Sequence, residues 1–326
     1  MIRPSVQIAS LAALVALSLP LMQASAQTQV PAAPAVSAPA PAAAPTFPPP
    51  EAKNFTASFP SKETVNSFLA ANWGYDETRV WQVQAILKTP VESISKVVVF
   101  VGDKTGKDKP AALQFFALAD GKHIITGDQI VAFGANPFAD ARTQLQQEAN
   151  GPYRGAAAKD LELVEFADFQ CPHCKEAQAN MEKLATDFPK ARIVFQTDPI
   201  AAIHPQAVEA AGYGVCVSSL GGSPAFFSYA AAVFDGQDGL ATADGATLTL
   251  NSAVTKAGLD PAKVAACAVT PQTKATVDAS VKLAESLGVN QVPMLLVNGR
   301  SVPANAPYDT LKKIITYQAK LDGITL

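Results

Sequence analysis

Residues 164–174 read VEFADFQCPHC, an apolar run that ends in two cysteines separated by two residues. The apolar run predicts a buried strand over residues 161–166, and the segment 172–187 predicts the helix that follows it. Pro172 suits the first position of that helix, because the backbone N–H that proline lacks would have no partner there. The cysteine pair is therefore expected where a strand turns into a helix.

This position gives the first cysteine its chemistry. At a helix N-terminus, unpaired backbone N–H groups and the positive end of the dipole stabilise a thiolate. Cys171 is thus the predicted nucleophile, with a lowered pKa, and Cys174, one turn further on and more buried, is the predicted resolving thiol. His173 adds a second potential positive partner for the Cys171 sulfur. Because these features stabilise the reduced state, they make the Cys171–Cys174 disulfide oxidising.

Two other uses of a C-x-x-C pair are a permanent structural disulfide and half of a zinc site. A zinc site needs two further ligands, and the sequence contains no second C-x-x-C and no pair of histidines at metal-binding spacing. His204, the other histidine of this half of the chain, follows a predicted strand and precedes Pro205, which indicates a loop. We therefore expect redox chemistry with no metal and no cofactor beyond the cysteine pair itself.

Residues 151–326 form the predicted domain around this centre. After the first strand and helix come a strand at 192–196, an Ala-rich helical region at about 204–286 and a strand at 294–297. A turn and a helix over 308–320 close the chain. This order predicts an α/β class, as a thioredoxin fold with an inserted helical subdomain.

The N-terminus indicates export. Arg3 precedes an apolar run from Ile8 to Leu21, and Ala24-Ser25-Ala26 forms a cleavage site, so residues 1–26 are predicted to be a signal peptide. A membrane anchor is the alternative, but the apolar run is short for a span. A periplasmic or otherwise extracytoplasmic location follows. The Ala/Pro-rich residues 27–53 predict an extended linker.

Residues 54–150 predict a smaller α+β domain. Ser61 can cap a helix that begins at Lys62, and Asp120-Gly121 is a hairpin signal. The predicted strands and the closing helix of this domain cover residues 80–87, 97–101, 113–118, 123–133 and 140–148. No catalytic constellation lies in this region, so scaffolding, dimerisation or substrate contact are its expected roles.

The remaining cysteines and the charge limit the other functions. An exported protein with an even number of cysteines usually pairs them, and pairing Cys171 with Cys174 leaves Cys216 for Cys267. A second redox relay is the alternative for that pair. The net charge of −3, without a long basic run, argues against a nucleic-acid partner.

Two motifs in this order resemble the DsbA family of periplasmic dithiol oxidases: residues 164–174 and residues 288–299, GVNQVPMLLVNG. The resemblance covers residues 151–326. It implies that Pro293 is a cis-proline facing the disulfide and that the backbone of Val292 pairs with an extended substrate segment. It also implies that Glu165 is a buried acid that relays protons to and from Cys174, the alternative being a partly exposed strand carboxylate.

The resemblance extends to the second cysteine pair and, more weakly, to the N-terminal domain. Cys216 and Cys267 resemble the second disulfide of many DsbA-like proteins. Residues 120–128, DGKHIITGD, resemble a hairpin in the dimerisation domain of DsbC- and DsbG-type isomerases, which implies a homodimer. The CPHC sequence and the Val before Pro293 resemble the oxidases instead.

Three functions follow as hypotheses. The first is an oxidase that introduces disulfides into unfolded or reduced proteins and is reoxidised by a membrane quinone-linked partner of the DsbB or VKOR type. The second is a dimeric disulfide isomerase or reductase, kept reduced by a DsbD-type partner. The third is a non-catalytic chaperone or metal-binding protein, in which Cys171 would be dispensable.

Overall fold

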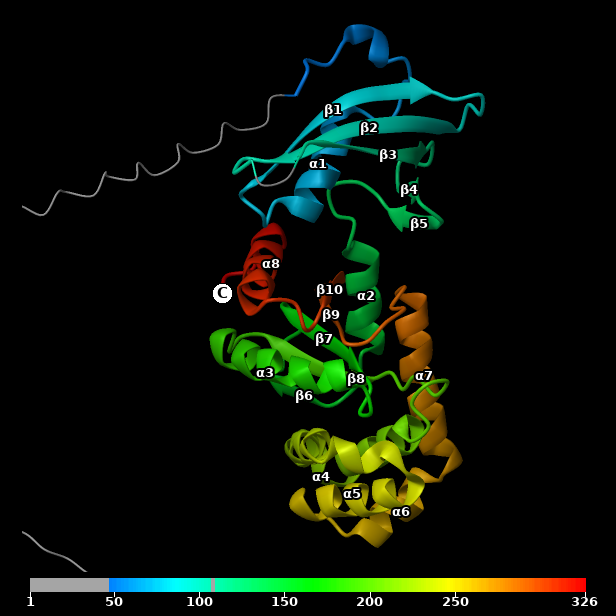
Figure 1. Cartoon of the computed structure of the whole chain (residues 1–326), viewed down its shortest axis with the longest axis vertical. Coiled ribbons are helices and arrows are strands. Elements are labelled where there is room, and N and C mark those ends of the chain that lie inside the picture. The colour runs from blue at the N-terminus through cyan, green and yellow to red at the C-terminus, as the bar shows by residue number, and fades with distance from the viewer. Residues whose placement is uncertain (1–46, 107–108) are drawn as a thin grey trace, which may run out of the picture. The chain divides into compact units, whose positions relative to one another are not determined.

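The computed structural model describes residues 47–106 and 109–326, all within one compact unit that spans residues 42–326. The predicted signal peptide and most of the predicted linker lie outside the described residues. Within the described ranges, no helix combines the length and the apolar character that crossing a membrane requires. The described chain contains two five-stranded sheets with helices packed against them (Figure 1).

The first sheet is an antiparallel meander in the order β1-β2-β3-β4-β5. Helix α1 (Lys62–Trp73) packs on it, and its N-terminus is capped by the Ser61 hydroxyl, which accepts a hydrogen bond from the Thr64 N–H at 3.1 Å. Val65 and Leu69, one turn apart, bury their side chains among the residues of the sheet. The strands are β1 (Arg79–Lys88), β2 (Ile94–Asp103), β3 (Ala111–Leu118), β4 (His123–Thr126) and β5 (Gln129–Ala132).

One predicted strand of this sheet is wrong in its length. The run 123–133 is two short strands, β4 and β5, which pair with each other antiparallel. The turn between them contains Gly127 at φ 60°, in the left-handed region that glycine adopts without strain. The apolar residues on both sides of Gly127 alternate as they would in one strand, so their pattern concealed the turn.

The second sheet has the strand order β10-β9-β7-β8-β6. Strand β7 (Glu162–Ala167) lies parallel to β8 (Arg192–Thr197), and β9 (Met294–Val297) lies antiparallel on the other side of β7. Two edge strands of three and four residues were not predicted, β6 (Tyr153–Gly155) and β10 (Arg300–Pro303). Helices α2 (Ala139–Glu148), α3 (Pro172–Asp187) and α8 (Tyr308–Leu321) belong to this part of the chain. This architecture confirms the predicted thioredoxin fold.

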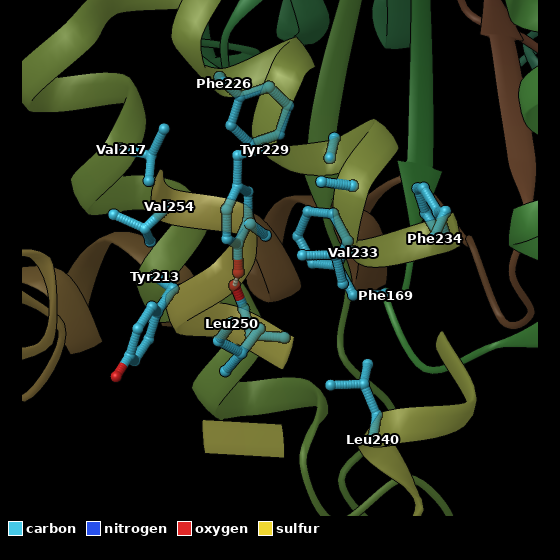
Figure 2. Packing of buried hydrophobic residues seen from close by; sticks show 14 of the residues in the cluster. Phe169, Tyr213, Val217, Phe226, Tyr229, Val233, Phe234, Leu240, Leu250 and Val254 are labelled. Carbon is cyan, nitrogen blue, oxygen red and sulfur yellow. Dashed lines mark hydrogen bonds between the residues drawn. The ribbon is translucent and has the colours of Figure 1, made fainter. Parts of the chain in front are cut away.

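The inserted helical region follows β8 and ends before β9. It consists of α4 (Ala207–Asp235), a 3-10 helix η2 (Gln237–Ala241), α5 (Ala243–Lys256), α6 (Pro261–Ala268) and α7 (Pro271–Ser286). Helix α4 is broken at Gly222, whose φ of 73° is not helical. Figure 2 shows the aromatic and aliphatic cluster at its centre, where Phe169 from the active-site segment packs against Tyr229 and Phe234 with ring centroids 5.6 and 5.3 Å apart.

A buried cation on β10 contacts the end of α1. The Arg300 guanidinium donates to the carbonyls of Ala71 and Asn72, and its Nε donates to Gln318 Oε1 at 3.0 Å. Burial lowers the pKa of Arg300 to about 10. Because the last carbonyls of a helix have no partners within it, this arginine serves as a C-terminal cap for α1.

Candidate active site

The cysteine pair lies at the end of β7 and the start of α3. Cys171 is the N-cap residue of α3, with extended backbone angles, and Pro172 occupies the first helical position. Cys171 is 6% exposed and Cys174 is completely buried, and both are free thiols. The nucleophile and the resolving thiol predicted from the sequence therefore differ in their access to solvent, and Cys171 is the one that an incoming thiol can reach.

The surroundings of Cys171 favour its thiolate. A hydrogen bond from the Cys174 thiol lowers the pKa of Cys171 to about 6, helped by the backbone N–H groups of Cys174 and His173 and opposed by burial and by the negative charge of Asp168. The backbone groups are the unpaired donors of the first helical turn. At neutral pH the sulfur of Cys171 is therefore mostly an anion.

Cys174 is held in the opposite state. The hydrogen bond that its thiol donates to Cys171, together with burial, raises the pKa of Cys174 far above the ordinary thiol value. The Asp168 N–H also points at the Cys174 sulfur, at 3.4 Å. The reduced pair is thus one thiolate and one thiol that share a proton, and the thiol is the inner member.

The His173 side chain, which we expected beside the sulfur, takes another partner. Its Nδ1 lies 3.0 Å from Glu176 Oε2, and the ring is 64% exposed. The hydrogen bond with Glu176 is the main cause that raises the pKa of His173, while the charge of Cys171 contributes least. His173 therefore stabilises the thiolate mainly through its backbone N–H.

Glu165 is buried on β7, so the alternative of a partly exposed carboxylate is wrong. It is 2% exposed, and burial raises its pKa to about 7, against the opposing effects of a hydrogen bond from Gln178 and of the charge on Arg154. The Gln178 side-chain amide donates to Glu165 Oε1 at 2.8 Å and to the Cys174 carbonyl at 3.1 Å. Gln178 thus connects the carboxyl group to the residue that holds the inner thiol.

The second motif meets the first at the sulfur. The Val292–Pro293 peptide bond is cis, and the Val292 carbonyl oxygen lies 4.0 Å from the Cys171 sulfur. Pro293 directly precedes β9, which pairs with β7 in the sheet. Residues 120 positions apart in sequence therefore face each other across the active site.

The second cysteine pair lies in the inserted helices. Cys216 on α4 and Cys267 on α6 form a disulfide, with their Cα atoms 5.9 Å apart. The Thr273 hydroxyl is 3.3 Å from the Cys216 sulfur and donates to the Cys267 carbonyl at 2.9 Å. This disulfide joins two helices of the insertion and carries neither the solvent access nor the helix-start position of Cys171.

Sequence reasoning missed a buried pair beside the active site. Asp168 has no exposed surface and accepts hydrogen bonds from the N–H groups of Gln170 and Ile200, both at 2.7 Å. Its Oδ2 also lies 2.8 Å from His204 Nδ1. His204 does lie in a loop, as predicted, but that loop is fastened to the active-site turn. The position of Asp168, three residues before Cys171, was the available signal; nothing in the local sequence connected it to His204.

Two glutamines were also missed. Gln170, adjacent to Cys171, accepts from the Gln206 N–H at 2.8 Å and donates to the Leu240 carbonyl at 3.0 Å. Gln237 in η2 donates to the carbonyls of Phe169 and Cys171. Gln178, by contrast, lies four residues after Cys174, so helical periodicity could have placed it on the same face. In the part of the chain that the structure describes, no three His, Cys, Asp or Glu side chains are grouped as a metal site requires.

Comparison with known proteins identifies the family of this site. A family model described as thioredoxin matches residues 147–317, more than half of the chain. Among curated proteins, residues of this chain are 37% identical over 65 positions to Na(+)/H(+) antiporter NhaA 1 of Salinispora arenicola, a match that covers 18% of this chain and 10% of the antiporter. This chain therefore spans about a tenth of the length of that curated relative.

Solved structures with similar folds include three exported or redox-related proteins. A periplasmic thioredoxin-like protein from Salmonella enterica serovar Typhimurium is 23% identical, with 56% of this chain and 95% of that chain covered and a TM-score of 0.45. The thiol-disulfide exchange protein alpha-DsbA2 from Wolbachia pipientis is 19% identical, with coverage of 55% and 96% and a TM-score of 0.47. DsbA2 from Pseudomonas aeruginosa is 25% identical, with coverage of 52% and 93% and a TM-score of 0.44.

Proposed function

The chain belongs to the thioredoxin family and is a thiol–disulfide oxidoreductase, and on that premise we propose that it is an oxidase that introduces disulfides into exported proteins. The observation that supports this direction is the unequal pair of sulfurs. Cys171 has a pKa of about 6 and Cys174 has a raised pKa, so the reduced pair is stabilised as a hydrogen-bonded thiolate and thiol. A dithiol that is stable when reduced has a disulfide that readily accepts electrons.

The reaction proceeds in two exchanges. A thiolate of the substrate attacks the Cys171 sulfur of the oxidised pair; the Cys171–Cys174 bond breaks, and Cys174 leaves with the bonding electrons and takes up a proton. The second thiolate of the substrate then attacks the substrate sulfur of this mixed disulfide and releases Cys171 as a thiolate. The substrate loses two electrons and gains a disulfide, and the two cysteines carry the electrons with no other cofactor.

Glu165 is the proposed proton donor and acceptor for Cys174. Its pKa of about 7 lets the carboxyl group exist in both protonation states near neutral pH. Its burial keeps competing water away, and Gln178 holds it toward the start of α3. When Cys174 departs as a thiolate of raised pKa, a protonated Glu165 supplies the proton that this sulfur requires.

The cis peptide bond and its neighbours form the proposed substrate platform. The Val292 carbonyl next to the Cys171 sulfur is available to an extended peptide that adds itself as a strand. Unfolded or reduced proteins are the proposed substrates. We place the protein in the periplasm, where a quinone-linked membrane partner of the DsbB or VKOR type takes up the two electrons.

The redox state of the pair in cells tests this proposal. Alkylation trapping of the tagged full-length protein should find Cys171 and Cys174 mostly oxidised, and loss of the quinone-linked partner should shift them to the reduced form. The purified oxidised protein should oxidise a peptide with two thiols, whereas a Cys171→Ser variant should not. A pair that is mostly reduced in cells, or a wild-type Cys171 with an ordinary thiol pKa, would exclude an oxidase.

One observation favours a disulfide isomerase or reductase as the second candidate. Phe116, Ile125 and Ile130 are cross-strand neighbours on β3, β4 and β5, and they form an apolar row on the face of the first sheet that turns away from buried Ile124. Ile130 is 66% exposed. Such a row fits a second copy of this chain, and an isomerase that works as a dimer, kept reduced by a DsbD-type partner, would use it.

Sedimentation of the full-length protein separates these alternatives. If the apolar row joins two copies, Ile130→Glu should convert a dimer into a monomer, while Leu248→Glu, at an equally exposed apolar position on α5, should leave the dimer intact. The isomerase candidate further requires that the full-length protein rescue scrambled disulfides and that Ile130→Glu abolish this rescue. A wild-type protein that sediments as a monomer removes the candidate.

A further inference from the structure

Gln237 is a buried glutamine of the inserted helical region that reaches the backbone of the nucleophile. It is 9% exposed, and its side-chain amide donates to the Phe169 carbonyl at 2.8 Å and to the Cys171 carbonyl at 3.0 Å. One amide group therefore holds the backbone on both sides of residue 170. The residue lies 66 positions from Cys171 in sequence, in η2.

The position of Gln237 is fixed by a reciprocal contact. Gln170 of the active-site turn donates to the carbonyl of Leu240, three residues after Gln237, at 3.0 Å. The side chains of Leu240 and Phe169 are completely or almost completely buried in the same hydrophobic cluster (Figure 2). The active-site turn and η2 thus each supply a glutamine to the other's backbone, over a shared apolar floor.

The Cys171 carbonyl is a demanding place for this contact. It also accepts the N–H groups of Cys174 and Lys175, at 3.1 and 3.2 Å, which begin the hydrogen bonding of α3. The orientation of this carbonyl therefore sets the orientation of the first turn of α3. The N–H groups of His173 and Cys174, which favour the thiolate, belong to that turn.

We propose that Gln237 is a positioning residue for thiol–disulfide exchange: by holding the carbonyls of Phe169 and Cys171, it fixes the first turn of α3 around the nucleophilic sulfur. A carbonyl oxygen carries a partial negative charge, and a donor placed on it reduces the repulsion that a nearby thiolate experiences. Loss of the amide leaves buried carbonyl groups without this donor and lets the turn relax. The inference rests on exchange at Cys171, but it does not depend on whether the protein works as an oxidase or as an isomerase.

The test compares the reactivity of Cys171 in full-length variants. Gln237→Met keeps the length of the side chain and removes both donors. Gln84→Met is the matched control, because Gln84 is also buried and donates to a backbone carbonyl, that of Pro48 at 2.8 Å, in the first sheet. Gln237→Asn keeps an amide that is too short to reach both carbonyls and provides a milder variant if Gln237→Met folds poorly.

We expect Gln237→Met to raise the Cys171 pKa by roughly one unit, which lowers the thiolate fraction and the rate of alkylation at pH 5 about tenfold. The equilibrium constant with glutathione should shift about tenfold toward the disulfide for the same reason. Gln237→Asn should show a smaller shift in the same direction. Gln84→Met should lower the melting temperature without changing either quantity.

An unchanged Cys171 pKa in folded Gln237→Met or Gln237→Asn would overturn the inference, as would an equal shift in Gln84→Met. Failure of the proposed function looks different, because there the wild-type protein itself would have an ordinary Cys171 pKa or would fail to oxidise a peptide. The thiolate absorbance of the wild type, measured in the same titration, separates the two outcomes.

Discussion

Replacing Cys171 by serine in the reduced protein should remove a stabilising contribution that depends on pH. The folded protein lowers the pKa of Cys171 from 9.0 to about 6, so the native state favours the thiolate more than the unfolded chain does. A group whose pKa is depressed by folding stabilises the protein above its unfolded pKa, and this stability is lost as the pH falls through the folded pKa. The reduced wild type should therefore lose stability, relative to Cys171→Ser, between about pH 9 and pH 5.

The size of this contribution follows from the two pKa values. Three units correspond to about 4 kcal/mol well above pH 9, about 1.4 kcal/mol remains at pH 7, and almost nothing remains near pH 5. These figures are upper limits, because water that reaches the sulfur screens its interactions. Glu165 titrates in the same range, but it is present in both proteins and largely cancels in their difference.

Urea unfolding of three forms across this pH range provides the measurement. The difference in unfolding free energy between reduced wild type and Cys171→Ser should grow with pH as calculated. The oxidised wild type should follow the pH slope of Cys171→Ser, because a disulfide binds no proton in either the folded or the unfolded state. If the reduced wild type and Cys171→Ser have the same slope, the sulfur is not held as an anion and the reasoning is refuted.

Three further changes give separate predictions. Glu165→Gln should slow peptide oxidation at pH 6 at least about tenfold and abolish the loss of rate that the wild type shows as the pH rises through 7, because the amide cannot deliver a proton. The double variant Cys216→Ala and Cys267→Ala opens a loop with a sequence separation of 51 and should lower the unfolding free energy by up to about 4 kcal/mol in urea, with no change in the Cys171 pKa. Arg300→Met should cost about 2 kcal/mol in the same assay, because buried carbonyls at the end of α1 lose their donors, while the rate of peptide oxidation stays the same.

The sequence was informative about the second sheet because its signals are local. The apolar run before Cys171, the proline after it and the Asn298-Gly299 turn each determine the structure of their own neighbourhood. The strand β7, the start of α3 and the β9–β10 hairpin therefore lie where they were expected. The edge strands β6 and β10 escaped prediction because three or four residues carry too little periodicity, and their pairing depends on neighbours far away in sequence.

The chemistry of the pair was predictable, whereas the framework that holds it was not. A cysteine at a helix start has a lowered pKa for reasons of backbone geometry, and these reasons are visible in the spacing of Cys171 and Cys174. The contacts of Asp168 with His204 and of Gln237 with Cys171 join segments 36 and 66 positions apart. Polar residues of such segments look like ordinary loop or helix-end residues until the fold brings them together.

The framework explains why a helical subdomain is inserted at this point of the fold. Loop closure after β8 brings His204 to Asp168, and the insertion brings Gln237 to the carbonyl of Cys171, so two separate segments hold the turn from opposite sides of the nucleophile. Asp168 by itself opposes the thiolate, because its charge raises the pKa of Cys171. The hydrogen bonds from Cys174 and from the first turn of α3 must outweigh both this repulsion and burial for the pKa to reach about 6. Those bonds are short-range and directional, so they persist only while the turn is held in place. A redox centre that depends on such bonds therefore needs a rigid support, and the inserted helices provide it.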